Sequence, residues 1–114
     1  MKTIGEFARK PELIKIELDS EDIQREFGDS VVFYMKDFVD ISTYFDFFQA
    51  QAESSDQLSV ILQRLILTED GLPALTPDRQ LPASLAIAAL TRINETLGKF
   101  GTKSLMKQDG IQPA

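Results

Sequence analysis

Two stretches in the first third of the chain carry apolar residues in patterns typical of β-strands. Residues 13–18 alternate apolar and polar side chains, which predicts a strand with one buried face. Residues 31–35 are rich in β-branched and aromatic side chains and predict a second strand. The sequence between them begins with Ser20 and two acidic residues and reaches Gly28. These start and stop signals predict a short helix over 21–27.

Helical spacing of apolar residues replaces the strand pattern from about residue 42. A helix beginning there is predicted to place Ile41, Phe45 and Phe48 on one side. Residues 54–57 fit a capping box, which predicts the start of a second helix. The apolar positions of this second helix form one face, and they are Leu58, Ile61, Leu62, Leu65 and Ile66.

Prolines shape the predictions for both ends of the chain. Thr76 followed by proline signals a helix start, whereas Pro82 disfavours an uninterrupted helix. We therefore expect one helical turn over 77–80 and a main helix over 82–97. The predicted buried face of the main helix consists of Leu85, Ala89, Ile93 and Leu97. Near the other end, a capping box formed by Thr3 and Glu6 predicts a helix over 4–10, before Pro11.

This order of elements predicts an α+β fold, with a small antiparallel strand pair or sheet followed by a mainly α-helical region. The 114 residues correspond to one domain. We assign residues 1–98 to a single α+β domain. Residues 99–114 show little periodicity and contain three lysines, two glycines and one proline, so we expect a flexible C-terminal tail.

The composition removes most catalytic chemistry. The chain has no cysteine and no histidine, so it lacks the usual thiolate nucleophile, the usual general base and the commonest metal ligands. Five acidic residues lie in 37–63 without a basic one, but their spacing does not match an EF-hand. We therefore predict no enzyme activity, no cofactor and no metal site.

Charge and hydropathy limit the partners. Twelve basic residues face eighteen acidic ones, for a net charge of −6, which argues against nucleic acid as a partner. No apolar stretch approaches the roughly 20 residues that span a bilayer, and the first residues contain no apolar segment of the kind found in secretion signals. We therefore expect a cytoplasmic protein that does not bind membranes.

The aromatic segment from Phe38 to Phe48 is the most informative part of the sequence. One core-facing stripe does not easily hold Tyr44, Phe45, Phe47 and Phe48 together. Either the helix is sandwiched in a thick core, or some of these rings belong to a partner surface. The predicted partner-binding residues are Tyr44, Phe47, Phe48, Leu58, Ile61, Leu62 and Leu65.

A turn before the last helix carries a family resemblance. In EDGLPALTPD, the residues Asp70, Gly71, Pro73, Thr76 and Asp78 match the pattern D-G-x-P-x-x-[ST]-x-[ED]. The preceding segment VFYMKDFVDISTYFDFFQAQ is similar to a strand followed by an aromatic-rich helix. Over roughly residues 12–98, the chain resembles the tail assembly chaperones of lambda-like long-tailed bacteriophages.

The resemblance implies a function without catalysis. Such proteins bind the tape-measure protein, a long helical chain, and keep it soluble in the host cytoplasm until tail-tube subunits polymerise around it. In this family a translational frameshift can append a domain that recruits the tail-tube protein, and the segment GTKSLMKQ is where such an extension would begin. Several copies coating one long chain would gain by multivalency, so we expect a homo-oligomer.

Two other classes of function stay open at this point. The chain could be a structural component that remains in the particle, such as a tail-completion or connector protein, or a small adaptor domain for protein interactions. It could also be an enzyme or metal protein that uses carboxylates alone.

Overall fold

The computed structural model describes residues 1–53 and 55–98. The first position of the predicted capping box at 54–57 and the predicted tail over 99–114 lie outside the described residues. The elements are, in chain order, the 3₁₀ helix η1 (Ile4–Phe7), β1 (Leu13–Leu18), α1 (Glu21–Phe27), β2 (Val31–Lys36), α2 (Ile41–Glu53), α3 (Ser55–Leu65) and α4 (Ala83–Gly98). The predicted α+β fold is confirmed, because an antiparallel strand pair precedes a helical region.

The strand pair is buried on one face only. Ile16 lies opposite Phe33 in the ladder, and the alternation of side chains across the sheet leaves Lys15 and Glu17 exposed on the other face. The short helix α1 joins the strands as predicted. The Ser20 hydroxyl accepts the backbone N–H of Ile23 at 3.3 Å, and Gly28 ends the helix with a φ of 87°, which favours glycine.

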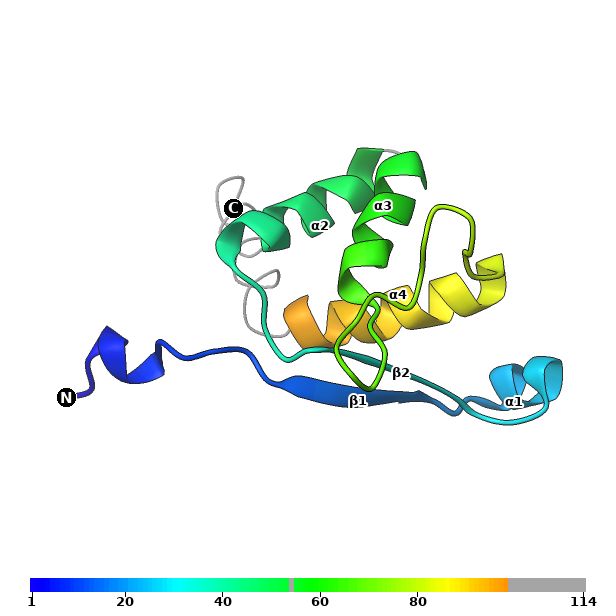
Figure 1. Cartoon of the computed structure of the whole chain (residues 1–114), viewed down its shortest axis with the longest axis horizontal. Helices are drawn as coiled ribbons and strands as arrows, with labels where there is room; N and C mark the ends of the chain where they lie inside the picture. The colour runs from blue at the N-terminus through cyan, green and yellow to red at the C-terminus, as the bar shows by residue number, and fades with distance from the viewer. Residues whose placement is uncertain (54, 99–114) are drawn as a thin grey trace, which may run out of the picture.

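The longer helices cover the apolar face of the sheet. In Figure 1, α2, α3 and α4 all lie on the same side of β1 and β2. α4 buries the four residues that its spacing predicted, Leu85, Ala89, Ile93 and Leu97. They join one core cluster with the inner face of the sheet and the facing sides of α2 and α3.

The predicted helix over 4–10 is wrong in its extent. The capping interaction is present, because the Glu6 carboxylate accepts the backbone N–H of Thr3 at 2.7 Å, but only the turn η1 forms. None of its residues is buried, so no tertiary packing supports a longer helix in this segment.

The predicted helical turn over 77–80 is also wrong. Thr76 and Arg79 exchange two backbone hydrogen bonds, of 3.2 and 3.0 Å, and so close a tight turn instead. Pro82 then stands at the start of α4, where its carbonyl accepts the N–H of Ala86 at 2.9 Å. A proline at this place keeps a carbonyl that the helix uses and removes no helical hydrogen bond.

The segment that carries the family resemblance forms a short extension of the sheet. Leu67 and Tyr34 exchange backbone hydrogen bonds of 3.0 and 2.7 Å. The chain then turns back at Gly71, whose φ of 82° is again one that favours glycine, so that Ala74 bonds to the carbonyl of Ile66 at 3.1 Å. No helix in the described ranges is long and apolar enough to cross a bilayer.

An N-terminal arm, residues 1–12, leaves the body of the protein beyond the end of β1 (Figure 1). Its base is held by Asp37, whose carboxylate accepts the Arg9 guanidinium and the backbone N–H of Glu12, each at 2.9 Å. The Arg9 guanidinium also lies 4.6 Å from the centre of the Phe38 ring, a favourable cation–π distance. The arm is therefore fixed at its base, while residues 1–7 remain exposed.

The same contacts lower the pKa of Asp37. The hydrogen bond from Arg9 is the main cause, and the backbone N–H of Glu12 adds to it. Because both contacts favour the ionised carboxyl, they stabilise the fold fully at pH values above the ordinary pKa of about 3.8. Their contribution is lost as the pH falls through the lowered pKa.

The attachment of the arm is therefore expected to depend on the charge of Asp37. D37N keeps the shape of the side chain but removes its charge, so trypsin at neutral pH should cut after Arg9 several-fold faster than in the wild type. D78N, which neutralises an exposed aspartate in another segment, is the matched control. In the wild type, the Glu12 amide resonance should titrate with a midpoint below 3.8. Equal cleavage of the two variants would contradict this role of Asp37.

Candidate functional site

Most of the predicted partner-binding residues lie in the core of the chain. Five are buried, namely Tyr44, Phe47, Ile61, Leu62 and Leu65, and two, Phe48 and Leu58, are half-buried. Phe47 is only 1% exposed. Tyr44 and Phe47 therefore belong to a thick core, which is one of the two alternatives that the sequence left open, and do not form a surface. A partner would have to use the residues that line grooves around this core.

The aromatic helix α2 turns only part of its apolar side chains toward the core. Ile41 and Phe45, which the spacing placed on one side of the helix, are exposed, with Phe45 47% accessible to solvent. Tyr44, Phe47 and Ala50 face inward instead. The apolar side chains left over from the core are therefore Ile41 and Phe45, one turn apart on the outer side of α2.

A polar clamp between α3 and α2 accounts for this orientation of α2. The Arg64 guanidinium donates to the Thr43 hydroxyl at 3.0 Å and to the Asp46 carboxylate at 3.2 Å. Thr43 and Asp46 are three residues apart and share one side of α2. When that side faces Arg64, the neighbouring positions Tyr44 and Phe47 turn into the core.

The start of α2 is fixed by Asp40. Its carboxylate accepts the Thr43 hydroxyl at 2.6 Å and the Thr43 N–H at 3.4 Å, an N-cap arrangement. The hydroxyl hydrogen bond is the main cause of a lowered pKa at Asp40. A carboxyl with a lowered pKa holds its negative charge and is a poor proton donor. Through these hydrogen bonds Asp40 holds the start of α2, as Asp37 holds the base of the arm.

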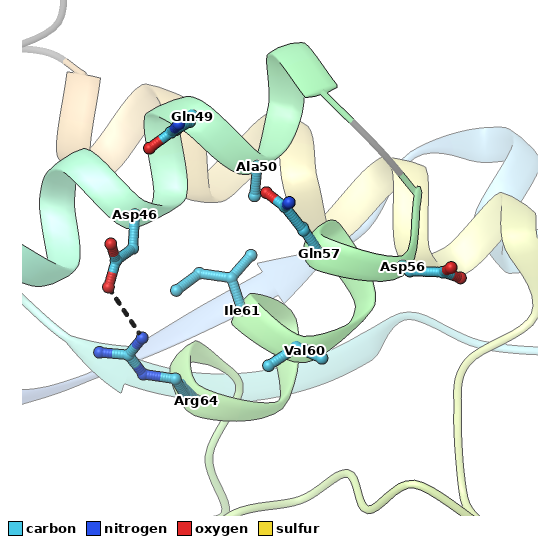
Figure 2. Close-up of a pocket in the computed structure, with 8 residues that line it drawn as sticks. All are labelled: Asp46, Gln49, Ala50, Asp56, Gln57, Val60, Ile61 and Arg64. Atoms are coloured by element: carbon cyan, nitrogen blue, oxygen red, sulfur yellow. Dashed lines mark hydrogen bonds and ion pairs between the residues drawn. The ribbon is translucent and has the colours of Figure 1, made fainter.

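A first groove lies between α2 and α3 and has a volume of about 330 Å³. Figure 2 shows Ala50 and Ile61 facing each other across it, with Val60 beside them. Its borders are polar: the Asp46–Arg64 ion pair closes one end, and Asp56 stands at the other. This groove combines an apolar floor with carboxylates at its rim.

A second groove, of about 290 Å³, lies between α3 and the segment that leads into α4. Four half-buried or buried leucines line it, namely Leu58, Leu62, Leu75 and Leu81. The remaining lining residues are neutral, and a 2.9 Å hydrogen bond joins Ser59 to Gln80. We call this surface the leucine groove. It contains no charged residue among its lining residues.

The leucine groove brings together predicted and unpredicted residues. Leu58 and Leu62 belong to the predicted surface, whereas Leu75 and Leu81 were not identified. Both unpredicted leucines lie in the irregular segment between α3 and α4, where apolar residues follow no helical or strand period. The one available signal was their position beside the turn residues Thr76 and Pro82.

The carboxylates do not gather into a metal site. Within residues 1–53 and 55–98, no three potential ligands lie close enough to hold an ion together. Comparisons with protein families, with curated proteins and with solved structures give no match to this chain.

The orientation of α2 gives a direct test on stability. F47A removes a fully buried ring and should lower the free energy of unfolding by about 3–5 kcal/mol. F45A removes an exposed ring from the same helix and should cost less than about 1 kcal/mol. Urea unfolding followed by circular dichroism measures both. The observed packing would be contradicted if F45A were the more damaging of the two.

Proposed function

We propose that this protein is a non-enzymatic assembly chaperone of a phage tail, which binds the tape-measure protein and keeps it soluble before the tail tube polymerises. The observation that carries the proposal is the leucine groove, an apolar and uncharged channel along α3. A long helical client presents an apolar stripe, and a groove of this kind accepts such a stripe by the helix-in-groove mode.

The sequence resemblance supports the identity of the client. The turn that matches the family pattern ends at Asp78, and the chain then forms the Leu81 side of the leucine groove. Leu75, within the same turn, lines the groove as well. The segment that resembles the tail chaperones therefore builds one wall of the surface proposed to bind the client.

The charge of the chain suits this role. The net charge of −6 would keep a client coated with several copies in solution, because like charges on separate coated chains repel each other. A weak groove repeated along one long client would also gain affinity by multivalency. Both effects require many copies on one client, in agreement with the expected homo-oligomer.

The alternative is a structural protein that stays in the particle, such as a tail-completion or connector protein. Mass spectrometry of purified particles distinguishes the two functions. A chaperone leaves the finished tail, so its peptides should be absent, whereas peptides of a connector should be present in fixed proportion to those of the other tail proteins.

Co-expression with a fragment of the tape-measure protein encoded in the same genome tests the chaperone function. The wild-type chain should raise the soluble fraction of the fragment. A83R places a long charged side chain at an exposed position that lines the leucine groove, so it should reduce this effect several-fold without disturbing the core.

L72R is the matched control, since Leu72 is exposed and does not line the groove. It should solubilise the fragment as well as the wild type does. A fragment that precipitates equally with and without the wild-type protein would refute the chaperone function. Equal losses for A83R and L72R would refute the leucine groove as its site.

A further inference from the structure

The N-terminal arm displays apolar side chains that no residue of the described ranges 1–53 and 55–98 covers. Ile4 is 91% and Phe7 is 62% exposed, although both belong to the turn η1. In a 3₁₀ helix the side chains at positions i and i+3 lie directly above one another, so Ile4 and Phe7 point the same way. The arm therefore presents a small apolar projection formed by Ile4 and Phe7, which we call the knob.

The knob is held in a defined shape away from the body. Glu6 caps the turn through the N–H of Thr3, and the Lys2 ammonium lies 5.8 Å from the centre of the Phe7 ring. These contacts all lie within the arm, and its base is fixed by Asp37 as described above. An apolar pair that is ordered and yet exposed is typical of a contact surface.

The arm and the body carry opposite charge. Residues 1–12 contain Lys2, Arg9 and Lys10 against Glu6 and Glu12, a net charge of +1, which leaves −7 for the rest of the chain. The charged residues that line the groove between α2 and α3 are Asp46, Asp56 and Arg64, a net charge of −1, and Asp46 is paired with Arg64. Asp56 is therefore the carboxylate of this groove that a basic side chain of the arm can meet.

The groove between α2 and α3 matches the arm in polarity. Its apolar floor of Ala50, Val60 and Ile61 matches an apolar pair, and Asp56 at its rim matches a basic side chain such as Lys2. Val60 is 58% exposed, whereas Ala50 and Ile61 are each 3% exposed, so Val60 is the part of the floor that an incoming side chain reaches. The leucine groove has no charged lining residue and offers the basic arm no such match.

We propose that the N-terminal arm of one copy binds the α2–α3 groove of a second copy, with Ile4 and Phe7 on the apolar floor. The two surfaces of this contact are different, so it is heterologous: each copy gives one arm and receives another. Repetition closes into a ring or continues as an open chain. This inference does not depend on the nature of the client, which is assigned to the other groove.

Size-exclusion chromatography with light scattering, over a series of concentrations, tests the proposal. The wild-type mass should rise above that of a monomer. The double variant I4D/F7D removes the apolar pair of the arm, and V60R blocks the groove; both change only exposed positions. Each should raise the dissociation constant by about tenfold or more.

I87R is the matched control, because Ile87 is 64% exposed on α4 and does not line the groove. It should associate as the wild type does. A wild type that stays monomeric at every concentration would overturn the proposal. So would association that I87R abolishes while V60R leaves it intact.

Mixing the two damaged variants gives a sharper result. V60R keeps its arm and I4D/F7D keeps its groove, so an equimolar mixture should form a heterodimer with one contact and no larger species. A contact between identical surfaces would not produce this pattern. Absence of the heterodimer, when each variant alone is folded by circular dichroism, would overturn the proposal.

The charge component is tested by exchange. K2E and D56K should each weaken association, and the weakening should be greatest at low salt, where exposed charges are least screened. If Lys2 approaches Asp56, combining the two substitutions should restore association to near the wild-type level. If the combined variant instead associates more weakly than either single variant, this placement of the arm is contradicted.

Discussion

A two-stranded sheet does not hold its shape alone in water, and this constraint accounts for most of the architecture. β1 and β2 have six residues each, and only one of their faces is buried. α4 lies against β1 and supplies part of the missing cover, while α2 and α3 complete the core over it. The apolar sides of the helices pack against the sheet and against each other. The apolar surface that remains for partners therefore consists of groove floors and a few outer side chains.

The sequence predicted the elements whose signals are local. The alternation in β1, the Ser20 and Gly28 boundaries of α1 and the four-residue spacing in α4 all correspond to observed structure. Each of these signals has one structural interpretation. A helix with a single apolar stripe, for example, can turn only that stripe toward the core. The errors at η1 and at the Thr76–Arg79 turn arose where short segments lack the packing that would extend a helix.

The orientation of α2 could not be predicted in the same way. Apolar side chains occur on more than one side of this helix, so periodicity alone does not select the inner side. The selection comes from Arg64, 18 residues beyond Asp46 in the sequence. For a similar reason the sequence identified only one side of the leucine groove: Leu58 and Leu62 line it, but its opposite wall comes from an irregular segment without a period.

The hydrogen bonds of the sheet favour association through the helices. The backbone groups of Tyr34 bond to Leu67, so they point away from β1. By the alternation of an antiparallel ladder, the backbone groups of its partner Lys15, and those of Glu17, point to the outer edge of β1. The Arg92 guanidinium donates a hydrogen bond to the Glu17 carbonyl at 2.6 Å. Lys15, two residues away on the same strand, is exposed.

A lysine and a covering side chain are devices that keep an edge strand from pairing with another chain. The sheet is thus protected at β1, and at β2 the strand is partly covered by Leu67. The helical layer is hollowed instead by two grooves with apolar floors, one bordered by charged side chains and one without charged lining residues. Two grooves of different chemistry select different occupants, so self-association through the basic arm and binding of an apolar helix need not compete for one surface.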